Sequence, residues 1–244
     1  MKLKNLRLLR SLAVLTAASG AWAAETISFS GYTWIIRPSG RGGPGPNDWE
    51  PKNVSVDTNG YLHLRLTQRD GKWYCAQLHT QERLGFGRYQ FWVTGAVDKL
   101  NENIVLGLFN YPTSDVGPDG THEIDIEFAR WGNRSAPIGN YTVWPATNSV
   151  RRESKSFACT LKGDLSRHSF AWSATNVVFD SRDESGGDRD RQLGTWVFQP
   201  TNPAARISQK AMPVFINLWC FRGKSPSDGK GVELIVRAFK FTPL

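Results

Sequence analysis

The stretch EIDIE at positions 123–127 alternates three carboxylic acids with two isoleucines. On a β-strand, residues two apart share a face, so Glu123, Asp125 and Glu127 line one side and the isoleucines supply core contacts on the other. A solvent-facing strand often carries one or two charges. Three like charges in a row repel one another, and strands disfavour these residue types. The pattern therefore indicates a functional site, where the carboxyl groups take part in catalysis or binding.

The reach of the two glutamates fits a retaining glycosidase. Cα atoms four residues apart on a strand are ~13 Å apart. Glutamate side chains that lean inward bring their carboxyl groups to about 5–6 Å, close to the spacing at which one attacks the anomeric carbon and the other transfers the proton. Asp125 between them can separate the two pKa values. A calcium site also uses acids, but usually takes its ligands from a loop that wraps the ion.

Short alternating segments separated by turn residues fill the rest of the chain. They are 60–68, 87–95, 103–111, 122–130, 139–146, 167–174, 176–181, 212–221 and 232–241. Asn59-Gly60 is a hairpin signal before the first of them. Many short, evenly spaced strands predict an antiparallel sandwich or jelly roll. No repeat or linker divides the chain, so we expect one domain over residues 24–244. The charged stretch 180–192 is expected to be a solvated loop.

Residues 1–23 have the pattern of a secretory signal peptide. A basic start precedes a short apolar run and the A-x-A cleavage signal Ala21-Trp22-Ala23. The apolar run is too short to span a membrane. Without the four basic residues of this segment, the net charge of +8 falls to +4. We therefore expect a secreted or periplasmic protein with no membrane partner, and a modest, dispersed charge gives no indication of nucleic acid binding.

The chain has three cysteines, Cys75, Cys159 and Cys220. An oxidising compartment would allow one pair to form a disulfide and would leave one thiol over. No CxxC motif or Cys/His cluster is present, which argues against a zinc site. We expect the cysteines to be small buried side chains.

Four segments together resemble glycoside hydrolase family 16, which comprises secreted β-glucanases and their relatives. They are HEIDIEF (122–128), CAQLHTQERLGFGRYQF (75–91), RHSFAWSATNVVF (167–179) and FINLWCF (215–221). The single-residue spacing of EIDIE looks like the bacterial lichenase-type branch, because the laminarinase-type branch has an extra residue before its last glutamate. The resemblance implies an all-β, concanavalin A-like β-jelly-roll sandwich of two antiparallel sheets, with a sugar cleft on its concave face.

The same resemblance implies roles for individual residues. Glu123 would be the nucleophile, Glu127 the general acid/base and Asp125 the assisting acid. Aromatic faces stack on sugar rings and amides bind hydroxyls; for Phe109, core packing is the alternative. The substrate-binding residues implied are Gln77, His79, Phe109, Tyr111, Asn140, Trp144, Asn217 and Trp219.

The sequence also departs from the lichenase pattern. Thr121 stands where a tryptophan is usual, and Gln77 and His79 replace a charged pair that binds sugar hydroxyls. Asn47 takes the position of the cysteine that would bridge Cys75. Arg237 takes the position of an aspartate that helps to hold a structural calcium ion. These changes leave open the mixed-linkage substrate, the disulfide and the calcium; no cofactor is required for the reaction.

The leading hypothesis is a monomeric, secreted retaining endo-glycosidase that hydrolyses a β-linked polysaccharide, either a β-glucan or a related polymer. One alternative is a transglycosylase on the same fold, which passes the glycosyl-enzyme to another sugar. The other is a catalytically silent carbohydrate-binding protein. Intact acids favour an enzyme over the binding protein, because binding alone needs no pair of glutamates at this spacing.

Overall fold

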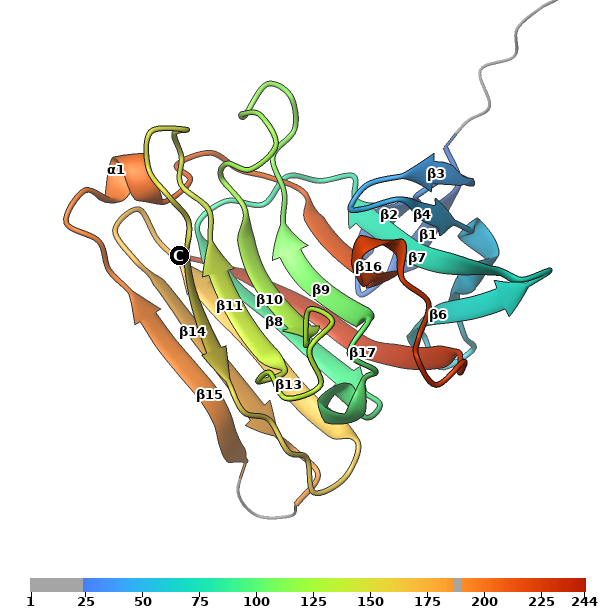
Figure 1. Cartoon of the computed structure of the whole chain (residues 1–244). Coiled ribbons are helices and arrows are strands. Elements are labelled where there is room, and N and C mark those ends of the chain that lie inside the picture. Colours follow the sequence, from blue (N-terminus) through green and yellow to red (C-terminus); the bar gives the residue numbers. More distant parts are fainter. Residues whose placement is uncertain (1–23, 187–189) are drawn as a thin grey trace, which may run out of the picture.

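The computed structural model describes residues 24–186 and 190–244, so the predicted signal segment lies outside the described residues. Two β-sheets face one another and enclose the core (Figure 1). In the described part, the strand pairs are antiparallel except for β4 with β7. The predicted jelly-roll sandwich is confirmed.

The sheet that carries the acids is called the front sheet. Its strands are, in spatial order, β1 (Thr26–Phe29), β2 (Tyr32–Ile36), β7 (Lys72–Thr80), β16 (Val214–Cys220), β9 (Ile104–Asn110), β10 (Ile124–Ala129), β11 (Gly139–Val143) and β12 (Glu153–Phe157). The central strand pairs join segments far apart in the sequence, because β7 and β9 both pair with β16 near the C-terminus.

The second sheet, called the back sheet, covers the inner face of the first. Its strands are, in spatial order, β5 (Val54–Val56), β6 (Leu62–Arg69), β17 (Val232–Pro243), β8 (Gly87–Thr94), β13 (Leu165–Trp172), β14 (Val177–Asp183) and β15 (Arg191–Phe198).

The remaining elements are short. These short elements are β3 (Gly40–Gly42), β4 (Asn47–Trp49), the 3-10 helices η1 (Pro51–Asn53), η2 (Val97–Lys99) and η3 (Phe221–Gly223), and the helix α1 (Pro203–Arg206). The end of β6 pairs with the start of β7, and this pairing links the two sheets. No helix in the described ranges is long and apolar enough to cross a membrane.

Aromatic contacts between the sheets fill the core. Tyr141 of β11 stacks on Phe179 of β14 at 4.7 Å between ring centroids, and Phe128 of β10 meets His168 of β13 at 4.5 Å. Ile126 on β10 is fully buried beside them. Burying a side chain of this size stabilises the fold by roughly 1.5–3 kcal/mol. A one-residue slip of β10 would bury the acids, so this burial fixes the register.

The nine predicted strands all appear, with bounds that differ by a few residues. The Asn59-Gly60 turn joins β5 to β6, and Gly60 has a φ of 79°, the left-handed region in which glycine is favoured. The structure corrects the expectation for 180–192. Its two ends belong to β14 and β15 on the back sheet, and Asp183 is 2% exposed because it accepts hydrogen bonds from backbone amides and Arg191.

The three cysteines are buried with free thiols, in agreement with the expectation of small buried side chains. Asn47, at the position where the resemblance places a bridging cysteine, lies beside Cys75, whose thiol donates to the Asn47 Oδ1 at 3.4 Å. Asn47 also donates to the carbonyls of Pro44 and Cys220 at 2.7 and 2.9 Å. Hydrogen bonds from this one amide therefore hold the 44–47 turn against β16.

Candidate active site

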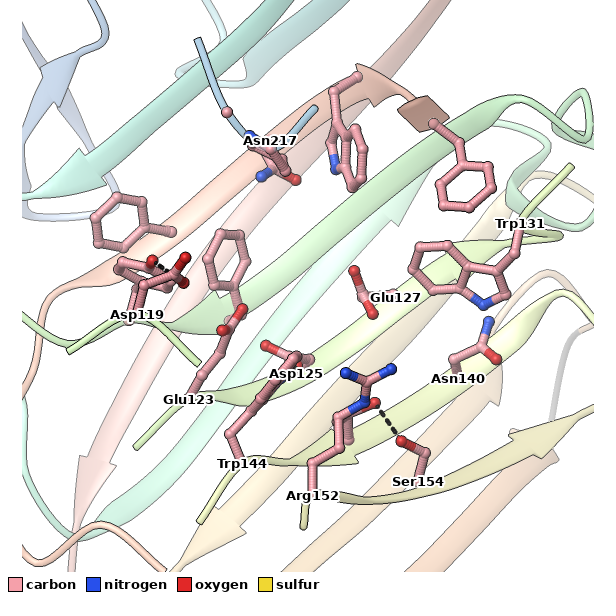
Figure 2. A pocket seen from close by; sticks show the side chains of 18 of the residues that line it. Asp119, Glu123, Asp125, Glu127, Trp131, Asn140, Trp144, Arg152, Ser154 and Asn217 are labelled. Atoms are coloured by element: carbon pink, nitrogen blue, oxygen red, sulfur yellow. Dashed lines mark hydrogen bonds between the residues drawn. The ribbon is translucent and has the colours of Figure 1, made fainter. Parts of the chain in front are cut away.

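The three acids lie on the outer face of the front sheet, as the alternation predicts (Figure 2). One detail of the prediction is corrected: β10 begins at Ile124, and Glu123 directly precedes it. Glu123 still continues the strand pairing, because its carbonyl accepts the amide of Trp144 at 2.8 Å. Asp125 is buried, and Glu123 and Glu127 are largely buried with a minor part of each side chain exposed.

Strand register places the other cleft residues in rows beside the acids. Asp125 lies between Thr142 of β11 and Phe109 of β9, and Glu127 between Asn140 and Gly107. The rows continue to β16 and β7, where Gly107 faces Asn217 and Asn217 faces Gln77. Side chains from distant parts of the chain therefore share one surface.

A cavity of about 860 Å³ lies over these rows. A side chain at Gly107 would displace Asn217 on the cavity wall, because a Cβ there would lie 2.5 Å from Asn217 Oδ1. Its walls are formed by the acids together with Arg37, Gly43, Pro44, Gln77, Phe109, Tyr111, Asp119, Trp131, Asn140, Thr142, Trp144, Arg152, Ser154, Ser156, Phe215, Asn217, Trp219, Phe221 and Arg222.

Burial raises the pKa of each of the three acids. It raises the pKa of Glu123 to about 8, and it raises the pKa values of Asp125 and Glu127 well above their ordinary range. The interaction between the Glu123 and Asp125 carboxyls lowers the pKa of Glu123 and raises that of Asp125. This is the effect expected when Asp125 keeps its proton beside an ionised Glu123. The interaction with Asp125 therefore favours ionisation of Glu123, whereas the charge of Asp125 raises the pKa of Glu127.

Trp144 and Arg152 support this group of acids. The indole Nε1–H of Trp144 donates to Asp125 Oδ2 at 2.8 Å. The Arg152 guanidinium lies over the Trp144 ring, 4.4 Å from its centroid. Its positive charge lowers the pKa values of Glu123, Asp125 and Glu127 and so partly offsets the effect of burial.

Aromatic side chains line the cleft beyond the acids. Phe109 stacks on Phe215 at 5.4 Å, and Tyr111 meets Phe215 edge-on at 5.6 Å. The Tyr111 hydroxyl donates to Asp119 Oδ1 at 2.6 Å. Faces of this kind suit the apolar sides of sugar rings. Phe109 is only 8% exposed, yet it lies on the cavity wall and is not part of the core cluster between the sheets, because it pairs with Asp125 and shares its outer face.

Two predicted binding residues are placed differently from the expectation. His79 does not line the cavity but stacks behind Phe215 at 4.7 Å, which makes it a support for that ring. Asn140 does line it, yet its amide donates to the carbonyls of Ala129 and Ile138 and accepts from Ser156. Asn140 therefore holds strand ends together and has little capacity left for a sugar hydroxyl.

The other predicted residues come together at the cavity: Gln77, Phe109, Tyr111, Trp144, Asn217 and Trp219. Asn217 is 3% exposed and its Oδ1 has no hydrogen-bond partner in the part of the chain that the structure describes. A buried acceptor of this kind gains most from a ligand donor.

Sequence reasoning missed several wall residues. Arg152, Ser154 and Ser156 lie on or next to β12, whose sequence ESKSF lacks alternating apolar residues. Arg37 directly follows β2 and Arg222 lies in the 3-10 helix η3, so neither belongs to an alternating pattern. Phe215 is the exception, because it opens the FINLWCF segment and a search for alternating aromatics on that strand would have found it.

Within 24–186 and 190–244, no group of three or more His, Cys, Asp or Glu side chains is arranged to hold a metal ion. Arg237, at the position where the resemblance places a calcium-binding aspartate, lies over the Tyr61 ring at 5.6 Å. A guanidinium cannot coordinate a cation, so this position does not fit calcium. A structural calcium ion at another position stays an open possibility from the sequence.

Solved structures share the fold. A Bacillus licheniformis beta-glucanase matches with a TM-score of 0.63 at 20% identity over 86% of this chain and 92% of its own. A prokaryotic beta-1,3-1,4-glucanase (lichenase) from a mouse hindgut metagenome matches with a TM-score of 0.61 at 19% identity, over 86% and 93% of the chains. A Bacteroides ovatus GH16 protein in complex with a G4G4G3G product matches at 0.63 and 14% identity, over 86% and 94%.

No family model matches the sequence, and no curated protein matches it either. At these identities the structural likeness establishes the fold. The chemistry must be argued from the residues of this chain.

Proposed function

We propose that this protein is a retaining endo-glycosidase that hydrolyses a β-linked polysaccharide. The observation that carries the proposal is the group of three carboxyls on the floor of an open, aromatic-lined cleft, in which Glu123 and Glu127 have different electrostatic surroundings. The fold shared with beta-glucanases supports the same reaction class and favours a β-glucan or related polymer.

In the first step, ionised Glu123 attacks the anomeric carbon of a sugar bound across the front sheet. The glycosidic C–O bond breaks, and Glu127 gives its proton to the departing oxygen. Burial raises the pKa of Glu127 well above its ordinary value and so favours the protonated form that a general acid requires. The products of this step are a covalent glycosyl ester on Glu123 and a shortened chain.

In the second step, Glu127 takes a proton from water as the water attacks the same carbon. The ester bond breaks and Glu123 is regenerated as a carboxylate. Asp125, held by the Trp144 indole, keeps its proton beside Glu123 and stabilises the ionised nucleophile between turnovers. Two inversions leave the product with the β configuration of the substrate.

The experiment is a screen of β-glucans, galactans and agar-type polymers with purified protein, read by the release of reducing ends. On a polymer that is cleaved, proton NMR during the first minutes should detect the β-anomer before mutarotation. An initial α-anomer would contradict double displacement. With an added oligosaccharide acceptor, longer chains without new reducing ends would instead indicate a transglycosylase. Tight binding without turnover would indicate a sugar-binding protein.

The pH dependence gives a separate prediction. Glu123 must be ionised to attack, and burial raises the pKa of its carboxyl to about 8, so the acidic limb of kcat/KM should lie well above the ordinary value of 4.5. Below that limb the enzyme is protonated at Glu123 and inactive, and activity rises with pH. The limb at higher pH reports loss of the Glu127 proton.

Arg152→Gln should move the acidic limb to higher pH, because the guanidinium lowers the pKa of Glu123. Arg152→Lys keeps the charge and should leave the limb near its original position. The measurement is kcat/KM from about pH 4 to 10 at constant ionic strength. An acidic limb near 4.5, or one that Arg152→Gln does not shift, would contradict this account.

Export remains a prediction that rests on the sequence of residues 1–23. The monomeric state and the absence of other partners are likewise expectations.

A further inference from the structure

The cleft wall contains three arginines, Arg37, Arg152 and Arg222. None of the three forms a salt bridge with a carboxylate among the described residues. Outside the cavity, Arg88, Arg130, Arg151 and Arg237 also form no salt bridge in this part of the chain, whereas nine arginines each pair with an acid: Arg41, Arg65, Arg69, Arg83, Arg134, Arg167, Arg182, Arg191 and Arg206. None of those nine lines the cavity. The cleft therefore holds guanidinium groups without a direct salt bridge, although the charge of Arg152 acts on the three acids at longer range.

Two of these arginines lie on opposite sides of the acids. Arg152 directly precedes β12, two strands from β10, and Arg37 directly follows β2, four strands from β10 on the other side. At about 4.8 Å per strand, the two backbone positions are ~10 and ~19 Å from the acidic strand. Figure 2 shows Arg152 on one side of Asp125 and Glu127, with Asn217 of β16 on the other. A polymer crossing the strands would pass both arginines.

Arg37 is a preorganised cation. Its Nη1 donates to the Gly43 carbonyl at 2.6 Å and to Gln77 Oε1 at 3.2 Å, and the guanidinium lies over the Trp49 ring at 4.1 Å. Burial lowers its pKa, which shows that the charge is partly removed from water. These contacts engage Nη1 and leave Nη2 and Nε for a ligand. A partly desolvated charge without a counter-ion is costly, and an anionic ligand removes that cost.

Arg152 is held in a similar way. Stacking on Trp144 orients its plane, while the side chain stays exposed at the cleft edge. It also borders a second, smaller hollow of about 340 Å³, which Trp144 and Arg151 line as well. A planar guanidinium with free donors binds a carboxylate or sulfate oxygen pair in a fork.

We propose that the cleft takes an anionic polysaccharide, a β-linked chain whose sugars carry carboxylate or sulfate-ester groups that bind Arg152 on one side of the cleaved bond and Arg37 on the other. The inference rests on the proposed glycosidase function and names its substrate class. The sugars at the cleaved bond itself are uncharged, because an anion there would meet Asp119, Glu123, Asp125 and Glu127. Anionic groups therefore belong on the flanking sugars.

The test uses matched polymers. Each neutral backbone that the enzyme cleaves is compared with two derivatives of the same chain, one partly oxidised to carboxylates at C6 and one partly sulfated. We expect kcat/KM to be about tenfold higher on at least one derivative, because one charge-assisted hydrogen bond is worth that factor. The two derivatives distinguish carboxylate from sulfate. Mass spectrometry of the products should find uncharged sugars at the newly formed ends.

Arg37→Gln and Arg152→Gln should each reduce the ratio of anionic to neutral kcat/KM about tenfold. The ratio cancels the effect of Arg152 on the acids, since both substrates share the same chemistry. Arg88→Gln is the control, because Arg88 is an exposed arginine on β8 of the back sheet and the same unit of charge is removed. Circular dichroism checks folding, and the exposed Arg152 remains a test if the Arg37 variant unfolds. Added salt should weaken only the anionic substrates.

Equal kcat/KM on neutral and anionic chains, or a ratio that neither variant changes, would overturn the inference and leave the glycosidase intact. Absence of cleavage on every polymer would overturn the proposed function instead. In that case, affinity electrophoresis of the Glu127→Gln protein in gels that contain the same polymers still tests whether the protein binds anionic chains more tightly than neutral ones. Equal retardation by neutral and anionic gels would refute it.

Discussion

Glu123→Ala should lower kcat on a cleaved polymer by about 10⁴-fold or more, because no other group can form the glycosyl ester. The substitution removes a partly exposed carboxyl from the cleft floor and leaves the buried face of β10 unchanged. Folding should therefore survive, as thermal unfolding can check. Glu82→Ala is a matched control, since Glu82 is exposed and does not line the cavity.

Azide distinguishes this role from a loss of structure. In Glu123→Ala the small anion can enter the vacated space and attack the anomeric carbon itself, from the side that Glu123 occupied. One inversion then gives an α-glycosyl azide, with Glu127 still protonating the leaving oxygen. Recovery of activity with that product is the expected result. A β-azide, or more than a tenth of the original activity without azide, would refute the assignment of Glu123 as nucleophile.

Glu127→Ala should lower kcat on polysaccharide by about 10²–10⁴-fold, the usual contribution of a general acid/base. The loss should be much smaller on an aryl glycoside with an acidic phenol, because that leaving group needs no proton. Glu123 still forms the ester in this variant, and azide then attacks the ester in place of activated water. Two inversions give a β-glycosyl azide.

The two azide products form a pair of opposite stereochemistry, so they assign both glutamates independently of rate. Exchanged products would mean exchanged roles for Glu123 and Glu127. Equal losses on polysaccharide and aryl glycoside in Glu127→Ala would instead show that Glu127 does not protonate the leaving group. Glu127→Gln preserves the shape of the side chain and should behave as Glu127→Ala does without azide.

Local patterns were enough to predict the strands and the acidic face. The period of two in EIDIE follows from backbone geometry alone, and burial of Ile124 and Ile126 leaves the acids only the outer face. The hairpin at Asn59-Gly60 is equally local, because Gly60 supplies the left-handed conformation that the turn needs. Where the alternation is weak, as in β12 and β15, the sequence predicts no strand.

Local sequence patterns could not predict which partners the polar side chains use for hydrogen bonds and packing. The type and strand position of Asn140 and His79 match a binding role, yet Asn140 uses its amide on strand-end carbonyls and His79 packs behind Phe215. Whether a polar group is free depends on which atoms surround it, and those atoms come from other strands.

The sequence by itself determined that this chain forms an antiparallel sandwich with three carboxyls on one exposed face, because strand period and burial act between neighbouring residues. The tertiary structure decided what surrounds those carboxyls. Gln77 meets Asn217 only because β7 pairs with β16, and Arg37 and Arg152 face the same cleft from opposite sides only because five strands lie between β2 and β12 in the front sheet. Register between distant strands is set by the total burial of both sheets, which no single segment encodes.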